Sequence, residues 1–280
     1  MIRVHPAIEK QTRTLISSLL DLVFPLRCVS CRTLGARICG PCVESIVWID
    51  SDHCPRCGIP HPGIKNHNCV EPERIRFIRS AAVFSGAMRK ALHALKYRSD
   101  RPLADQLVRM AHRHWNLPAW NFDALLPVPL GRRREQTRGY NQSRLLAEAL
   151  SRLTGIPVDA RVLTRARETP SQVGLSFQDR KQNMAGAFRA SGLHGRTLLL
   201  VDDVCTTGAT LQSCAETLRQ AGSVSVGAVT LARAIVPERH RNKNIFPTLP
   251  EDTHDHPNPS QHIRDGNDAP LEGLRGKEDQ

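Results

Sequence analysis

The stretch over residues 198–218 constrains the fold of this chain more than any other part. It begins with a continuous apolar run that ends in the adjacent aspartates Asp202 and Asp203. A turn of small residues follows, and the next apolar residues are spaced i, i+3, i+4, i+7, as on one face of a helix. The stretch therefore predicts a buried strand, a tight loop and a helix, which is the repeating unit of an α/β fold.

The loop and the two aspartates have the chemistry of a site for a phosphorylated sugar. A helix N-terminus presents unpaired backbone N–H groups and a partial positive charge, so small residues there allow a phosphate to approach closely. Carboxylates at a strand end accept hydrogen bonds from vicinal ribose hydroxyls, and ligands of open α/β sheets bind at that end. The competing structural interpretation is an Asp-rich turn before a capped helix. The complete string, Asp-Asp, a spacer and Thr-Thr-Gly-x-Thr after an apolar run, favours the binding site.

This string closely resembles the motif with which type I phosphoribosyltransferases bind phosphoribosyl diphosphate (PRPP). The resemblance implies that Asp202 and Asp203 contact the ribose hydroxyls and that Mg²⁺ accompanies the ligand. It also implies a cradle for the 5′-phosphate, made of Thr206, Thr207, Gly208, Ala209 and Thr210. Purine-salvage members typically carry an aspartate in the place of Thr206, so the resemblance argues against purine salvage. Cys205 fills a spacer position, and we interpret it as structural.

Apolar periodicity predicts the remaining elements of an α/β domain. Strands are expected over 78–84, 123–129 and 224–231, and helices with one buried face over 88–95, 103–111 and 146–153. Asp100 is expected to cap the second of these helices. Together with the PRPP motif, the alternation of strands and helices leads us to expect a type I phosphoribosyltransferase fold, a mostly parallel sheet flanked by helices.

Seven of the nine cysteines lie within residues 28–69, and six of these form Cys-x-x-Cys pairs. In a secreted chain this density would indicate disulfides. The apolar stretch over 14–24 contains Asp21, lacks a small-residue cleavage site and is too short to span a bilayer. We therefore expect no export signal, no membrane span and a reducing, cytoplasmic compartment. Paired cysteines in that compartment indicate a metal, and free buried cysteines are the less favoured alternative.

The first two cysteine pairs supply enough thiolates for one tetrahedral structural zinc ion. These four ligands are Cys28, Cys31, Cys39 and Cys42. A second site is expected at Cys54 and Cys57 with Cys69, and His67 is the candidate for its fourth ligand. Residues 26–72 show little apolar periodicity, so the segment needs such a metal in order to fold.

A group of basic residues lies upstream of the PRPP motif. The run Pro127-Val128-Pro129 predicts a strand end, and the arginines between it and Gly139 suit a loop that receives a diphosphate, because guanidinium groups bind phosphate in a bidentate manner. The candidates are Arg132, Arg134 and Arg138. We interpret the polar stretch over residues 163–188 as a mobile hood over the same site.

The order of three strings resembles that of the ComF family, which is associated with competence and the use of external DNA. These strings are Pro-Val-Pro, Arg-Gly-Tyr-Asn-Gln and Asp-Asp-x-x-Thr-Thr-Gly. The resemblance extends from about residue 19 to residue 235 and includes Leu95-Lys96-Tyr97-Arg98. It implies an N-terminal double zinc ribbon, and it implies PRPP binding more firmly than catalysed transfer.

The sequence thus predicts a helix over 1–25, a zinc-ribbon module over 26–72, a phosphoribosyltransferase-type domain over 73–236 and a disordered tail over 237–280. The favoured function is PRPP binding in the handling of imported DNA, alongside other DNA-uptake proteins. One alternative is an active phosphoribosyltransferase that transfers a pentosyl group to an unidentified base or amine. The other is a module that binds single-stranded DNA, with PRPP as a regulatory ligand. The formal net charge of +12 suits either kind of polyanion.

Overall fold

The structure is a computed structural model that describes residues 25–49, 54, 56–59, 75–98, 100–117, 120–167 and 186–235. The chain divides into two units, Met1–Pro247 and Thr248–Gln280, and every described residue belongs to the first. The predicted N-terminal helix and C-terminal tail, the ligand candidates His67 and Cys69, and most of the predicted hood lie outside the described residues.

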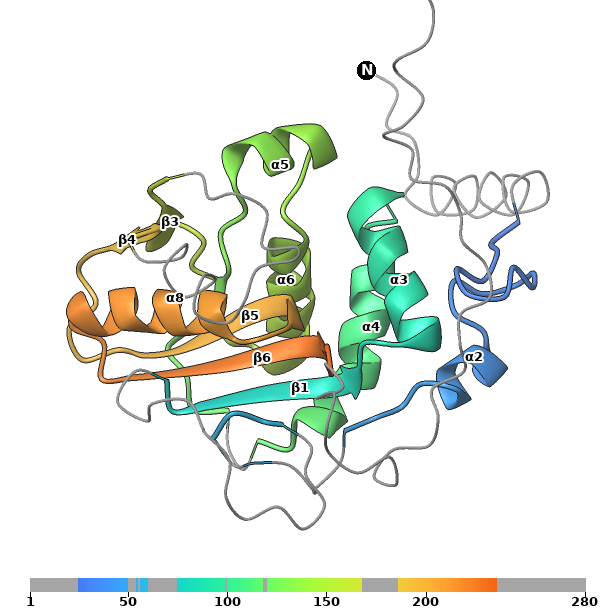
Figure 1. Ribbon diagram of the computed structural model, residues 1–280, viewed down its shortest axis with the longest axis horizontal. Helices are drawn as coiled ribbons and strands as arrows, with labels where there is room; N and C mark the ends of the chain where they lie inside the picture. Colours follow the sequence, from blue (N-terminus) through green and yellow to red (C-terminus); the bar gives the residue numbers. More distant parts are fainter. Residues whose placement is uncertain are drawn as a thin grey trace, which may run out of the picture. The chain divides into compact units, whose positions relative to one another are not determined.

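A parallel sheet of four strands forms the centre of the described structure, in the order β1-β6-β5-β2. Figure 1 shows β1, β6 and β5 side by side. The strands are β1 (Phe77–Val83), β2 (Ala124–Pro127), β5 (Thr197–Cys205) and β6 (Ser225–Arg233). Leu199 of β5 lies opposite Gly227 of β6 on one side and Leu125 of β2 on the other. The predicted strands and their parallel arrangement are thus confirmed.

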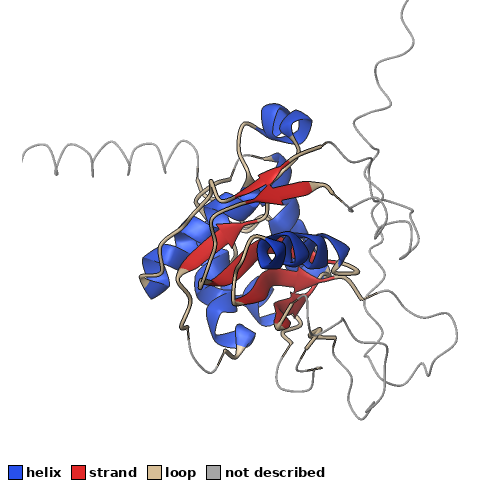
Figure 2. Ribbon diagram, turned by 90° about the vertical axis from the view of Figure 1, so that its left-hand side faces the viewer, coloured by secondary structure: helices blue, strands red, loops and turns tan. Residues whose placement is uncertain are grey.

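Helices cover both faces of this sheet, as Figure 2 shows. Side chains of β5 alternate between two buried clusters, because successive residues of a strand point to opposite faces. Leu199 and Val201 belong to the cluster that contains the helices of one face, and Leu198 and Leu200 belong to the other cluster. The first face carries α3 (Gly86–Tyr97), α4 (Leu103–Ala111), the 3₁₀ helix η1 (His112–Trp115) and α6 (Gln142–Thr154). The second carries α8 (Ala209–Gln220) and a small antiparallel sheet of β3 (Leu163–Arg165) and β4 (Phe188–Ala190).

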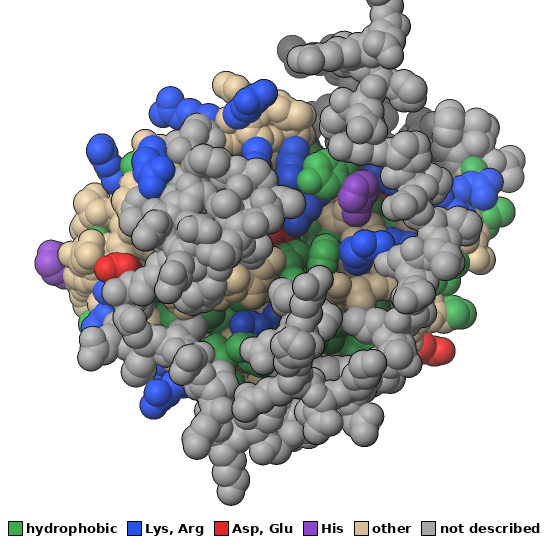
Figure 3. Space-filling view, in the orientation of Figure 1, with side chains coloured by type: hydrophobic (Ala, Val, Ile, Leu, Met, Phe, Trp, Pro, Cys, Tyr) green, Lys and Arg blue, Asp and Glu red, His purple; other side chains and the backbone are tan. Residues whose placement is uncertain are grey.

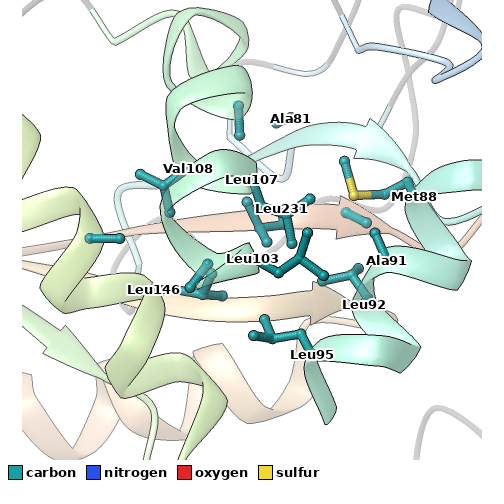
Figure 4. Packing of buried hydrophobic residues seen from close by; sticks show 14 of the residues in the cluster. Ala81, Met88, Ala91, Leu92, Leu95, Leu103, Leu107, Val108, Leu146 and Leu231 are labelled. Carbon is teal, nitrogen blue, oxygen red and sulfur yellow. The ribbon is translucent and has the colours of Figure 1, made fainter. Parts of the chain in front are cut away.

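The helical faces predicted from the sequence form the core of the first layer. Met88, Leu92 and Leu95 of α3 are fully buried, and they lie beside Leu103 of α4 and Leu231 of β6 (Figure 4). On the other side of the sheet, the predicted apolar face of α8 is also buried. Burial of these faces against the sheet supplies most of the hydrophobic stabilisation.

Two details of the predicted helices are wrong. Asp100 does not cap α4, which begins after Pro102 without a side-chain cap. The Asp100 carboxylate instead accepts a 2.7 Å hydrogen bond from Arg37, whose guanidinium is a stronger partner than a backbone N–H group. Leu153 of α6 is 42% exposed and does not belong to the buried face of that helix.

The cysteine-rich segment packs directly on the edge of the sheet. Trp48 pairs with Ala82 of β1 in an antiparallel bridge, and the backbone N–H of Ile49 donates to Ala81 over 2.8 Å. Cys28 and Cys42 belong to the same buried cluster as α3 and α4. This segment also contains the short helix α2 (Gly40–Glu44). Among the residues that the structure places, no helix has the length and apolar character needed to cross a bilayer.

The turn after Cys57 fits against β1 so closely that it accepts only glycine. The N–H of Ile78 donates to the carbonyl of Arg56 over 2.7 Å, and Gly58 has a φ of +68°. A Cβ at Gly58 would clash with the carbonyl oxygen of Ile78, whereas Gly155, at a φ of +78°, has nothing within 4 Å of the corresponding position.

We predict that Gly58→Ala lowers the free energy of unfolding more than Gly155→Ala does. The control should lose about 1–2 kcal/mol through its left-handed backbone alone. Gly58→Ala should lose at least ~1 kcal/mol more, because the backbone must also move away from Ile78. Urea unfolding measures both values, and equal losses would show that this turn is not tightly packed on β1.

Candidate ligand site and metal centre

Asp203 is held rigidly at the carboxyl end of β5. Its side chain is 5% exposed, and its Oδ1 accepts a 2.8 Å hydrogen bond from the N–H of Val204. The ammonium of Lys96, in the last turn of α3, lies 2.5 Å from its Oδ2. The charge of an ammonium group on a helix thus attracts this carboxylate and helps to orient it.

Asp202 is held by neutral donors from a different helix. Its Oδ1 accepts from the Ser143 hydroxyl over 2.7 Å and from the N–H of Asp203 over 2.9 Å. Ser143 lies in the first turn of α6, where the side chain of the N-cap Asn141 accepts from its backbone N–H. Burial first, and then the neighbouring Asp203 charge, raise the pKa of Asp202 to about 7. Two adjacent carboxylates therefore have different surroundings, which is common at ligand sites.

The predicted phosphate turn follows Asp203 after Val204 and Cys205, the last residues of β5. Gly208 has a φ of +81°, a left-handed conformation that glycine adopts without strain, and α8 begins at Ala209. The N–H of Ala209 donates to the Thr207 hydroxyl over 3.3 Å. Cys205, 1% exposed, lies behind the turn, and burial raises the pKa of its thiol, in keeping with a structural role. The structure thus brings the turn, a helix N-terminus and the aspartates together.

The three candidate arginines lie on α5 (Arg132–Arg138), which buries none of its residues. Arg138 donates to Gln142 over 2.9 Å, and its guanidinium lies 4.9 Å from the centre of the Tyr97 ring. This contact places Arg138 beside the start of α6, close to the helix turn that holds Asp202. The side chains of Arg132 and Arg134 are exposed and have no hydrogen bond or ion pair with the described residues. Lys and Arg side chains gather along the upper part of the face in Figure 3.

Three residues were not predicted as part of the site: Lys96 and Ser143, which contact the aspartates, and Tyr97, which contacts Arg138. Lys96 and Tyr97 belong to the string Leu95-Lys96-Tyr97-Arg98, which the family resemblance singled out without a role. Ser143 directly follows the Arg-Gly-Tyr-Asn-Gln string, and this position could have indicated from the sequence that it belongs to the site. Their contacts show that α3 and α6 both extend to the carboxyl end of β5.

The first four cysteines form a compact metal-binding cluster. The sulfur atoms of Cys28, Cys31, Cys39 and Cys42 all lie within 4.8 Å of one another. Zinc–sulfur bonds of about 2.3 Å in a tetrahedron separate the sulfurs by roughly 3.8 Å, so the spacing fits one zinc ion. Cys28 and Cys42 are buried, whereas Cys31 is exposed. Four thiols and no oxygen ligand favour zinc over Mg²⁺ or Ca²⁺.

Cys54 and Cys57, the third pair, are both buried against the sheet. The carbonyl of Cys57 accepts a 2.6 Å hydrogen bond from Arg233, at the end of β6. Because the other proposed ligands, His67 and Cys69, lie outside the described residues, the second metal site stays a prediction.

Family models match both parts of the chain: a double zinc ribbon domain at residues 19–71 and a phosphoribosyl transferase domain at residues 142–258. Together with the parallel sheet and the cysteine cluster, they confirm the predicted fold class. The DNA utilization protein YhgH of Salmonella typhi is 33% identical over 232 residues, which cover 76% of this chain and 100% of the relative. Competence protein F of Haemophilus influenzae is 33% identical over 230 residues, covering 75% of this chain and 98% of the relative.

Solved structures with some likeness to this chain include the orotate phosphoribosyltransferase of Mycobacterium tuberculosis in complex with PRPP. It is 17% identical, and the match covers 54% of this chain and 68% of that protein with a TM-score of 0.29.

We predict that protein purified without chelators contains at least one tightly held zinc ion per chain. Cys28→Ser should lose one equivalent of zinc, because three thiolates leave a tetrahedral site incomplete. Cys214→Ser, which changes a buried cysteine outside the cluster, should retain it. Elemental analysis measures the zinc content. Less than about half an equivalent in the unmodified protein would rule out a structural zinc site.

We predict that the raised pKa of Asp202 makes the stability of the fold depend on pH. The folded protein binds this proton more tightly than the unfolded chain, so ionisation of Asp202 destabilises the fold as the pH rises towards 7. Asp202→Asn keeps the acceptor oxygen for Ser143 and cannot ionise. The variant should be no more stable than the unmodified protein below about pH 4 and increasingly more stable towards pH 8.

Thermal unfolding between pH 5 and pH 8 measures this difference. Asp105→Asn is the matched control, since Asp105 is exposed and pairs with Arg152 over 2.7 Å. Asp105→Asn should change the free energy of unfolding by no more than about 0.5 kcal/mol. An Asp202→Asn variant that is no more stable than the unmodified protein at pH 8 would contradict the assignment of a raised pKa.

Proposed function

The chain belongs to the ComF family, which includes competence protein F and the DNA utilization protein YhgH, and on that premise we propose that it binds PRPP with Mg²⁺. One observation carries the proposal: Asp202 and Asp203 are joined directly to a small-residue turn at the N-terminus of α8. This arrangement offers carboxylates for vicinal hydroxyls and backbone N–H groups for a phosphate within one short segment.

Each part of PRPP has a counterpart among these residues. Asp202 and Asp203 accept hydrogen bonds from the ribose hydroxyls, and the turn over 206–210 surrounds the 5′-phosphate with N–H and hydroxyl donors. Arg138 is oriented by Gln142 and Tyr97, and we assign it to the diphosphate together with Arg132 and Arg134. Guanidinium groups suit this task because they bind phosphate oxygens in pairs.

The aspartate pair also fits Mg²⁺, which prefers carboxylate and phosphate oxygens. Among the described residues, only one ammonium group is paired with the two carboxylates, so the pair retains negative charge for a cation. Asp202 and Asp203 would hold the ion near the ligand. When bound, it would supply positive charge that neutralises the diphosphate.

The relatives' names connect this family with competence and with the use of DNA. We propose that the chain acts in the handling of imported DNA in the cytoplasm, where cysteine ligands stay reduced. Single-stranded DNA and other DNA-uptake proteins are the macromolecular partners that this role implies. PRPP then acts either as the substrate of a transferase or as a signal of nucleotide supply.

We predict that the protein binds PRPP with millimolar or tighter affinity in the presence of Mg²⁺. Replacing both aspartates, as Asp202→Asn with Asp203→Asn, should abolish the heat of binding, because the ribose and the metal lose their ionised acceptors. The matched control is Asp105→Asn with Asp159→Asn, which makes the same change in net charge at exposed or half-exposed ion pairs. Isothermal titration calorimetry measures all three proteins.

Equal binding by the folded aspartate variant would overturn the site assignment. The release of diphosphate is then measured while the protein is incubated with PRPP and a panel of nucleobases and amines. This measurement distinguishes a transferase from a sensor. A transferase consumes PRPP when its acceptor is present, whereas a sensor binds PRPP without releasing diphosphate.

A further inference from the structure

The ion pair between Lys96 and Asp203 joins two elements that are far apart in the sequence. Nζ of Lys96 lies 2.5 Å from Oδ2 of Asp203, and their side chains are 21% and 7% exposed. Lys96 is in the last turn of α3, and Asp203 is near the end of β5. The ammonium is therefore largely removed from water, and its charge acts on the carboxylates with little screening.

The pair differs from an ion pair that serves the fold alone. A structural ion pair balances one acid with one base, but here a second carboxylate, that of Asp202, lies next to the first. Neutral donors, the Ser143 hydroxyl and a backbone N–H group, hold Asp202. Among the described residues, Lys96 is the only base in an ion pair with either aspartate. The two neighbouring acids thus share one paired base among the described residues.

Such a site must accommodate two kinds of charge when PRPP binds. The anionic diphosphate is repelled by the aspartates and attracted by an ammonium group. A divalent cation is attracted by the aspartates and repelled by an ammonium group. Lysine suits an exchange between these partners, because it is a point charge on a flexible four-carbon stem.

We propose that Lys96 is the counter-cation of the aspartate pair, a positioning residue that holds Asp203 before the ligand arrives and then turns to the diphosphate of PRPP. This inference rests on the proposed PRPP binding. It adds Lys96 to the binding site and states that the ammonium group moves from Asp203 to the diphosphate. Lys96 keeps Asp203 oriented, and it lowers the affinity of the empty pair for free divalent cations. The ligand and its cation then replace Lys96 at the carboxylate together.

The test compares two lysines of the same helix. Lys96→Met removes the proposed counter-cation. Lys90→Met makes the same change in net charge at a site where the ammonium lies 3.4 Å from the carbonyl oxygen of Ser30, in the cysteine-rich segment. Electron paramagnetic resonance measures the binding of Mn²⁺ alone, and calorimetry measures PRPP with Mg²⁺.

Lys96→Met should bind Mn²⁺ about tenfold more tightly than Lys90→Met, or ~1.4 kcal/mol, because the competing charge is gone. It should bind PRPP about 10- to 100-fold more weakly, the range expected for the loss of one charge-assisted hydrogen bond. A residue that only supports the fold would lower stability without this opposite change in the two affinities.

Each other outcome has a definite meaning. Equal Mn²⁺ affinity of the two variants overturns the counter-cation proposal, whatever happens to PRPP. Tighter Mn²⁺ binding with unchanged PRPP affinity overturns the movement to the diphosphate. If the unmodified protein binds no PRPP, the proposed function fails, and the Mn²⁺ comparison still decides the role of Lys96. Should Lys96→Met fail to fold, Lys96→Gln removes the charge and keeps a polar side chain, although a shorter one.

Discussion

The parallel pairing of β5 between β6 and β2 is the constraint on which the rest of the structure depends. Parallel strands end at the same edge of a sheet, and each needs a crossover to return to the opposite edge. The helices that follow β2 and β5 therefore begin near one another, and the starts of α6 and α8 both lie beside the end of β5. Asp202 and Asp203 occupy the place where these helix starts meet. The chemistry of the site is thus a consequence of strand order.

The candidate metal centre and the candidate ligand site both contact α3. Towards its start, Lys90 of this helix donates to the carbonyl of Ser30 in the cysteine-rich segment, and Lys96 in its last turn pairs with Asp203. Arg37 also binds Asp100, just beyond the helix, over 2.7 Å. A segment with so little apolar periodicity acquires its order from the metal and from burial of residues such as Ile38 and Ile46 against this docking surface. Zinc therefore stabilises the surroundings of the helix that orients one of the two aspartates.

The sequence predicted those parts of the fold that carry a local periodic signal. The apolar run before Asp202 and the spaced apolar residues after it specify a strand and a helix, and the loop between them resembles a known motif. The pairing of Lys96 with Asp203 has no such signal, because an ion pair between distant residues leaves no spacing to read. The same reason explains why the prediction of Asp100 as a helix cap was wrong. Its neighbours in the sequence suggested a cap, but its partner, Arg37, lies far upstream. The bridge between Trp48 and Ala82 could not be predicted either, because the cysteine-rich segment shows no alternation of apolar and polar residues.

The aspartate pair is unfavourable for the fold without a ligand, and this distinguishes it from the surrounding core. Burial and the neighbouring Asp203 charge raise the pKa of Asp202 to about 7, so ionisation of Asp202 works against the folded state near neutral pH. A chain selected for stability alone would place an amide or an apolar residue there. Instead, Ser143 from α6 and Lys96 from α3 each hold one aspartate. Contacts from two separate helices thus offset part of the free-energy cost of placing two acids side by side. A phosphate ester bound together with a metal ion would balance the charge that remains.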